Sequence, residues 1–318
     1  MLIMLLYISY RSIVMRYSGV SESRYLMGTY FEIKVNGRNT GQYVKAALDK
    51  TREMSNQLNY YDGKSEISSI NNMAGIFAVA VSHDTFDIID KALSLSRRSG
   101  GSFDITIGPV VDLWNFKTKA VPSKNEIVYA QHLVDHRNVK LDQRNETVKL
   151  MYPGMKIDLG GVAKGYAISR IRSMLVDMGV KSAIISAGSS IAVIGDNNGK
   201  PWRIGIKDPR HPDDFIGVVK LNAGQALSTS GDYENYFEVA GKRYHHILDP
   251  FTGEPAEASR SVTIISNDAT LTDMLSTAVF IMGAKRGLPF VSSFPDTYAV
   301  VVDKDGNVAT SPGLVLER

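Results

Sequence analysis

A glycine pair set between an alternating segment and a helical pattern is the first feature of this sequence that could do chemistry. Residues 156–159 (KIDL) alternate polar and apolar side chains, as a short half-buried strand does. The pair at 160–161 follows, and residues 162–178 carry apolar side chains at helical spacing up to a glycine suited to a left-handed cap. A helix N-terminus in this setting offers N–H groups and a partial positive charge to an anion. The stretch predicts a phosphate cradle, in which Asp158 would hold a sugar hydroxyl, a ring nitrogen or a metal-bound water. The alternative is that the glycines only let a helix pack closely against a sheet.

Three oxygen-bearing side chains share one face of a second predicted helix at residues 270–283. Asp273, Ser276 and Thr277 stand at positions i, i+3 and i+4. A carboxylate and two hydroxyls are hard donors that suit Mg²⁺, which completes its shell with water and substrate phosphate. Most neighbouring positions are apolar, so these polar groups are expected near a buried surface. This favours a metal site over the alternative of a solvated helix face.

His246 lies near the end of a predicted strand at residues 243–248, which leads into the turn DPFTG at 249–253. Imidazole changes its charge near neutral pH and can act as a general base or acid. The alternative is a structural histidine bonded to the backbone of the turn. His245 would point to the opposite face of the strand, so only one of the two histidines can face a site.

The elements that must position these residues mix helices and strands along the whole chain. Gly28, inside a strand predicted at 24–35, indicates a bulge or a close approach by a ligand. Residues 102–109 (SFDITIGP) are predicted as a strand that carries a carboxylate and ends at Gly-Pro. Further helices are predicted at 40–58, 82–99 and 122–133, a hairpin at 137–152, and strands at 182–194, 202–207, 215–221, 226–237, 261–266 and 297–302.

Composition excludes several classes of function. The 318 residues include no cysteine, which excludes disulfides, thiolate zinc sites, iron–sulfur clusters, cysteine nucleophiles and a lipid-attached cysteine. The net charge of +3 comes without a basic stripe interleaved with aromatic residues, so nucleic acid is not expected as a partner. The G-x-S-x-G, H-E-x-x-H, G-x-x-x-x-G-K-[ST] and G-x-G-x-x-G signatures are absent from the sequence.

The chain is long enough for two units of about 150 residues or one elaborated domain. The apolar run at 2–10 is shorter than the about 20 residues that span a bilayer, and positive residues follow it rather than precede it. Residues 1–20 are therefore interpreted either as a membrane-anchor or signal-like segment or as an element packed on the body. Residues 21–318 are interpreted as the catalytic part.

Taken together and in this order, several stretches resemble the FAD:protein FMN transferase family, also called ApbE. The resemblance covers nearly the whole chain from Met27. The matching segments are MGTYFEI at 27–33, Tyr61 with Ser65, Glu66 and Asn71, GSFDITIGPVVDLW at 101–114, KIDLGGVAKGYA at 156–167, residues 202–209, STSGDYENYF at 228–237, HILDPFTGEP at 246–255, and Asp273 with Ser276 and Thr277.

The resemblance implies an α+β fold of two lobes with mixed sheets and FAD in the cleft between the lobes. It implies Mg²⁺ at the FAD diphosphate and transfer of FMN from FAD to a threonine hydroxyl of an acceptor flavoprotein, with release of AMP. The acceptor would be a subunit of a membrane redox complex. The expected location is the cell envelope, on the periplasmic face of the inner membrane, with the cytoplasm as the alternative. An FAD diphosphatase and a non-catalytic FAD-binding protein are the alternative functions.

The same resemblance assigns residues to three roles. His246 would be catalytic, and the metal would be held by the Gly161 carbonyl, Asp273 and Thr277. The chain departs from the family at residues 188–190, where Gly-Ser-Ser stands in place of a Gly-Gly-Asp-like sequence, so a contact in this loop is expected to be weaker. The implied FAD contacts are Met27, Tyr61, Ser102, Phe103, Asp104, Asp158, Lys164 and Leu248.

Overall fold

The computed structural model describes residues 19–114, 116 and 118–317. Residues 1–18, which make up most of the segment interpreted above as anchor-like or signal-like, lie outside the described residues. Within the described part of the chain, no helix is both long enough and apolar enough to cross a membrane.

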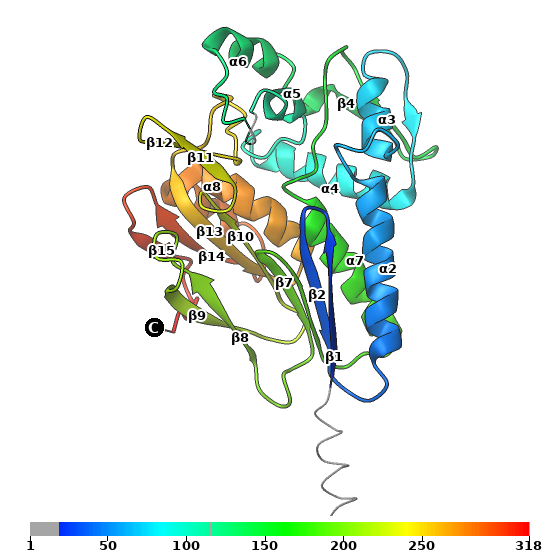
Figure 1. The fold of residues 1–318 in the computed structure, drawn as a ribbon, viewed down its shortest axis with the longest axis vertical. Coiled ribbons are helices and arrows are strands. Elements are labelled where there is room, and N and C mark those ends of the chain that lie inside the picture. Colours follow the sequence, from blue (N-terminus) through cyan, green and yellow to red (C-terminus); the bar gives the residue numbers. More distant parts are fainter. Residues whose placement is uncertain (1–18, 115, 117, 318) are drawn as a thin grey trace, which may run out of the picture.

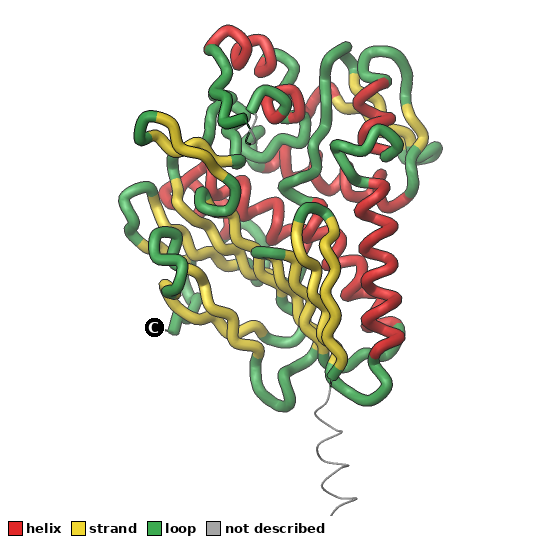
Figure 2. Tube along the Cα trace, viewed as in Figure 1, coloured by secondary structure: helices red, strands yellow, loops and turns green. Residues whose placement is uncertain are grey.

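An eight-stranded sheet forms the centre of the molecule, and each pair of neighbouring strands in it is antiparallel (Figure 1). Figure 2 shows these strands side by side, with helices along one flank. Across the sheet the order is β1 (Val20–Leu26), β2 (Thr29–Val35), β6 (Ala183–Ala187), β7 (Ser190–Ile194), β10 (Ala226–Gly231), β13 (Ser259–Ser266), β14 (Tyr298–Asp303) and β15 (Val308–Thr310).

The two faces of the sheet are covered by different structures. The helices α2 (Gly41–Gln57), α7 (Ala163–Asp177) and α8 (Ala269–Val291) pack on one face and enclose the main core. A ribbon of β8 (Trp202–Lys207) and β9 (Phe215–Leu221) encloses a second core on the other face. Side chains alternate between the two cores along a strand, so Ala192 faces the helices and Val193 faces the ribbon.

The remaining elements lie beyond one end of the sheet (Figure 1). They are α3 (Glu66–Asn72), α4 (His83–Arg98), α5 (Gly108–Val111), α6 (Lys124–Gln131), the 3-10 turn η1 (His136–Asn138), the small sheet of β3 (Val79–Ala80), β5 (Thr147–Leu150) and β4 (Val139–Asp142), and the hairpin of β11 (Tyr236–Val239) and β12 (Lys242–His245). A third core joins the β11–β12 hairpin to α5 and α6, and in it the ring of Phe237 stacks on that of Tyr244 with 5.3 Å between the ring centroids.

Local signals in the sequence correctly mark the ends of several helices. The hydroxyl of Ser82 caps α4 by accepting a hydrogen bond from the backbone N–H of Thr85. Gly179, with a φ of 86°, closes the end of α7 just beyond its last residue, and the N–H of Val180 donates back to the carbonyl of Leu175 at 2.9 Å. Gly283, where the predicted helix at 270–283 ends, interrupts α8 with a φ of 70°.

The strand predicted at 24–35 is wrong as one strand, because the structure has a hairpin there. Leu26 pairs with Thr29, and the two residues between them form the turn. Met27 and Gly28 have φ values of 50° and 76°, the left-handed geometry of the tight turns that connect twisted antiparallel strands. Gly28 is therefore a turn residue, not a bulge within a strand.

The strands predicted at 102–109 and 156–159 are also wrong. Neither segment forms a strand: residues 108–109 already belong to α5, and the two segments share an isolated parallel bridge between Ile107 and Lys156 and a hydrogen bond from the N–H of Asp158 to the carbonyl of Ile105 at 2.8 Å. The amide of Asn71 satisfies the backbone of Ile157 on both sides, accepting from its N–H at 2.8 Å and donating to its carbonyl at 3.0 Å. The side chain of Asn71 thus takes the place of a paired strand at Ile157. The alternation of polar and apolar residues does not predict this contact, because Asn71 lies 86 positions earlier in the chain.

Candidate active site

A cavity of about 500 Å³ opens where the β1–β2 turn, the loop at 102–107, the start of α7, the end of β10, the segment after β12, and α8 meet. Its volume lies within the about 300–1,000 Å³ typical of small-molecule sites. Around this one cavity the structure brings together the residues assigned through the family resemblance: Met27, Tyr61, Ser102, Phe103, Asp104, Asp158, Gly161, Lys164, His246, Leu248, Asp273 and Thr277. Ser276, the third side chain of the predicted oxygen-bearing helix face, does not line the cavity, and its hydroxyl donates to the carbonyl of Asp273 at 2.8 Å.

The glycine turn before α7 forms one wall of the cavity. The carboxylate of Asp158 accepts the backbone N–H of Gly160 at 2.6 Å, and burial raises the pKa of this carboxyl, with Asp112 adding to the effect. Lys164 lies in the first turn of α7 and donates to the carbonyl of Gly160 at 3.3 Å. The wall presents a helix N-terminus and an ammonium group, and both attract an anion.

The predicted phosphate cradle differs from the sequence expectation in one respect, because several backbone N–H groups at the start of α7 already donate to acceptors within the protein. The N–H groups of Val162 and Ala163 both donate to the carbonyl of Leu159, and that of Gly165 donates to Asp273 at 2.8 Å. Attraction of an anion to this wall therefore depends on the charge of Lys164 and the dipole of α7 more than on direct backbone donors.

Three oxygen-bearing groups that could hold a metal meet where α7 crosses α8. A Cβ on Gly161 would lie 3.4 Å from the Oγ1 of Thr277, so the absence of a side chain lets the turn backbone lie against that hydroxyl. The carboxylate oxygens of Asp273 accept from the N–H of Gly165 at 2.8 Å and from the hydroxyl of Ser190 at 3.2 Å. Each oxygen keeps a lone pair for a further partner.

This donor set is oxygen-only and contains a single carboxylate. Among the described residues, no group of three or more His, Cys, Asp or Glu side chains is placed to hold a metal. An all-protein cage is thus absent from the part of the chain that the structure describes. A carbonyl, a carboxylate and a hydroxyl suit Mg²⁺, which draws its remaining ligands from water and substrate phosphate.

His246 faces the cavity from the segment directly after β12. Its Nδ1 lies 3.3 Å from the carbonyl oxygen of Asn235, which also accepts the backbone N–H of His246 at 3.1 Å. A carbonyl can only accept, so Nδ1 carries the proton and Nε2 is the nitrogen that can take one up. Surrounding protein, together with the charges of Lys164 and His245, lowers the pKa of His246 to about 4, so the ring is neutral at pH 7.

His245 faces away from the cavity, as the strand pattern predicts. It is buried, its Nε2 lies 2.8 Å from the carbonyl oxygen of Ala256, and its Nδ1 accepts the N–H of Ile247 at 3.3 Å. Burial lowers the pKa of His245. This histidine links the backbone of Ile247, directly after His246, to the backbone of Ala256.

The residues expected to contact FAD occupy different depths of the cavity. Ser102 is fully buried, and its hydroxyl has no hydrogen-bond partner among the described residues. Tyr61 is 83% exposed at the rim and packs edge-on against Tyr60 at 5.1 Å. Both carboxylate oxygens of Asp104 are engaged by Thr106 and His136, so this side chain shapes the loop.

Several polar residues of the cavity were not predicted from the sequence as site residues. Ser230 lies 2.8 Å from the hydroxyl of Ser276 and 3.3 Å from that of Thr277, and the sequence signal for it was its place in the hydroxyl-rich matching segment at 228–237. Glu234 and Asn235 line the cavity from an irregular segment with no periodicity. In the loop that departs from the family pattern, Ser190 donates to Asp273.

Comparisons with known proteins agree with this geometry. The family model described as the ApbE family matches residues 27–302. A protein of Klebsiella pneumoniae named FAD:protein FMN transferase is 36% identical over 78% of this chain and 78% of its own length. One of Treponema pallidum with the same name is 31% identical over 93% of this chain and 87% of its own length.

Solved structures agree as well. The ApbE protein of Thermotoga maritima superposes with a TM-score of 0.87 at 37% identity, over 93% of this chain and 97% of that one. The flavin transferase ApbE of Vibrio cholerae gives a TM-score of 0.82 at 25% identity, with the same coverage of 93% and 97%. The mixed α and β architecture expected from the sequence is thereby confirmed, and the chain belongs to the ApbE family.

Proposed function

We propose that this protein transfers FMN from FAD to a threonine hydroxyl of an acceptor flavoprotein and releases AMP, in a reaction that depends on Mg²⁺. The observation that carries the proposal is the convergence of a neutral histidine and three metal-type oxygen groups on one cavity. The names of the relatives, FAD:protein FMN transferase, support the overall reaction.

The residues divide the work between binding and proton transfer. Lys164 and the start of α7 attract the diphosphate of FAD, and Gly161, Asp273 and Thr277 would hold Mg²⁺ beside it. When bound, Mg²⁺ neutralises negative charge on the diphosphate and stabilises the leaving phosphate. Tyr61 at the rim offers a ring on which a planar part of FAD can stack.

His246 supplies the general base. The threonine oxygen forms a bond to the FMN phosphorus, the bond from that phosphorus to the bridging oxygen breaks, and the AMP moiety leaves with the bridging oxygen. The hydroxyl proton passes to Nε2 of His246, a contribution of about 10²–10⁴-fold to the rate. Because the imidazole is neutral at pH 7, this nitrogen can accept the proton without first losing one.

The acceptor is proposed to be a subunit of a membrane redox complex at the periplasmic face of the inner membrane. The test is incubation of the purified protein with FAD, Mg²⁺ and a candidate acceptor subunit, followed by intact-mass analysis of the acceptor and chromatography of the released nucleotides. The expected result is an FMN adduct on a threonine and an equal amount of AMP. Free FMN with an unmodified acceptor would instead identify an FAD diphosphatase, and FAD recovered intact would identify a binding protein without turnover.

The metal site is tested by Asp273→Ala in the same assay. This variant is expected to lose Mg²⁺-dependent turnover while FAD still binds, because Asp273 supplies the only carboxylate of the proposed ligand set. FAD binding is followed by quenching of flavin fluorescence. Unchanged turnover in Asp273→Ala would remove this residue from the metal site.

A further inference from the structure

The orientation of His246 depends on a carbonyl that belongs to no helix or strand. Asn235 lies in the irregular segment 232–235 between β10 and β11. Its carbonyl oxygen accepts both the backbone N–H of His246, at 3.1 Å, and the Nδ1 proton, at 3.3 Å. The position of this one oxygen therefore decides which ring nitrogen carries the proton and which faces the cavity.

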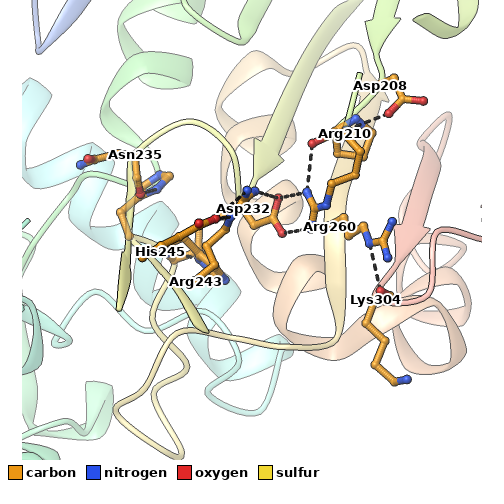
Figure 3. A network of polar contacts seen from close by, with 12 residues as sticks. Asp208, Arg210, Asp232, Asn235, Arg243, His245, Arg260 and Lys304 are labelled. Carbon is orange, nitrogen blue, oxygen red and sulfur yellow. Dashed lines mark hydrogen bonds and ion pairs between the residues drawn. The ribbon is translucent and has the colours of Figure 1, made fainter. Parts of the chain in front are cut away.

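A buried carboxylate anchors the first residue of that segment. Asp232 is only 7% exposed, and its two oxygens accept from the two terminal nitrogens of Arg210 at 2.8 and 2.6 Å (Figure 3). Its N–H donates to the carbonyl of Arg260 at 3.0 Å. A two-point contact between arginine and a carboxylate fixes both the distance and the angle of the side chain.

The anchor joins the segment to two other parts of the fold. Arg210 lies in the turn between β8 and β9, where its N–H donates to the carboxylate of Asp208 at 2.8 Å. Arg243 lies on β12, 3.7 Å from the carboxylate of Asp232, with its guanidinium 4.0 Å from the ring centroid of Tyr236. In Figure 3, Asp232 lies between Arg210 and Arg243. One carboxylate thus ties the start of the segment to the strand that leads into His246.

These three residues do not line the cavity of the candidate active site. Asp232, Arg210 and Arg243 line a separate cavity of about 280 Å³ that also contains His245. Neighbouring residues of the chain line different cavities: Gly231 and His246 line the larger one, whereas Asp232 and His245 line the smaller one. The three charged residues therefore lie outside the cavity proposed to hold FAD.

We propose that the pair of Asp232 and Arg210, supported by Arg243, positions His246. It holds the Asn235 carbonyl on Nδ1 and so keeps Nε2 as the proton-accepting nitrogen in the cavity. The catalytic consequence of this arrangement rests on the proposed function, whereas the arrangement itself can be measured without turnover.

The direct measurement is the ¹⁵N spectrum of the imidazole rings in protein labelled at histidine, with the signals of His246 assigned by His246→Gln. At neutral pH the wild type is expected to show a protonated Nδ1 and an unprotonated Nε2. Asp232→Asn keeps the shape of the side chain but weakens its hold on Arg210. In this variant the His246 signals are expected to move toward the opposite tautomer or an average of the two.

Kinetics give the second readout. Asp232→Asn is expected to lower kcat about 10- to 100-fold, the scale of a small misplacement of a reacting group. The KM for FAD is expected to stay unchanged, because no residue of the larger cavity is altered. Arg210→Lys, which keeps the charge but loses the two-point contact, is expected to fall between the wild type and Asp232→Asn.

Glu317→Gln is the matched control, because it breaks ion pairs with Arg203 and Lys220 on the same β8–β9 ribbon, and neither partner lines either cavity. It should change neither the tautomer of His246 nor kcat.

Should Asp232→Asn not fold, the double variant Asp232→Asn/Arg210→Gln leaves no unpaired buried charge and carries the same test. An unchanged tautomer in a folded variant overturns the proposal, whatever happens to kcat. If the tautomer shifts in Asp232→Asn but the wild type transfers no FMN to the acceptor, the positioning role is supported and the proposed function is overturned instead.

Discussion

At the scale of single residues, the site depends on the protonation state of His246. Its surroundings disfavour a second proton on the ring, because the nearby protein desolvates the charged form and the positive charges of Lys164 and His245 repel it, which lowers the pKa. Asp158, whose pKa is raised by burial, lines the same cavity. One cavity thus holds a base that stays neutral and a carboxyl that binds protons more tightly than usual.

A pH profile of kcat/KM tests this state of His246. An ordinary histidine has a pKa of about 6.5 and would be only about 10% neutral at pH 5.5. Since the pKa of His246 is lowered to about 4, the neutral base persists as the pH falls, and activity should be retained from pH 7 to pH 5.5 and lost only on further acidification. Replacing Lys164 by Met removes a charge that lowers this pKa, so the acid limb should move to higher pH. A wild-type profile that falls through pH 6.5 would contradict the assignment, provided that circular dichroism shows a folded protein.

At the scale of elements, the metal-type groups meet only because α7 and α8 cross closely at a glycine. A Cβ on Gly165 would lie 2.3 Å from the carbonyl oxygen of Ala269 and 2.5 Å from the Cβ of Asp273. Neither neighbour can move aside as the end of a flexible side chain could. The same glycine donates its N–H to Asp273, so the crossing also aims the carboxylate.

Gly165→Ala should therefore damage stability and activity together. We expect a loss of about 1–3 kcal/mol in the free energy of unfolding, the usual cost of forcing extra volume into a packed interior. Asp273 should move with α8, so the apparent affinity for Mg²⁺ should also fall. Gly41→Ala is the control, because that glycine begins α2 with no atom within 4 Å of an added Cβ. Urea denaturation measures both variants, and equal stability of the two would contradict this account of the crossing.

The elements also show which structure can be predicted from sequence. Helices α4 and α7 carry local signals for their period and ends, and both were predicted nearly to the residue. The segments at 102–109 and 156–159 carry strand-like alternation, but neither forms a strand, and at Ile157 the amide of Asn71 bonds both backbone groups in place of a paired strand. The site residues were predicted through the family motifs. The pair of Asp232 and Arg210 was not, because no local rule connects residues 22 positions apart.

At the scale of the whole molecule, the cavity joins parts of the chain that are far apart in sequence, from the turn at Met27 to Thr277 on α8. Only the folded chain brings these parts together, so a ligand of the cavity binds the native state and not the unfolded state. Such a ligand stabilises the fold by about 2.7 kcal/mol at 100 times its Kd. The main core and the cavity share the elements α7, α8 and β10, so this stabilisation should extend to global unfolding.

Thermal denaturation with FAD, with Mg²⁺ and with both tests whether the two ligands share one site. FAD alone should raise the Tm, since Lys164 and the cavity walls bind it without a metal. Mg²⁺ alone should have little effect, because the protein offers it one carboxylate and few other donors. Together they should raise the Tm by more than the sum, since the FAD diphosphate completes the metal's ligands. In Asp273→Ala the FAD shift should persist while the additional shift with Mg²⁺ disappears. Strictly additive shifts in the wild type would show that the metal and the dinucleotide bind independently, and would contradict a shared site between α7 and α8.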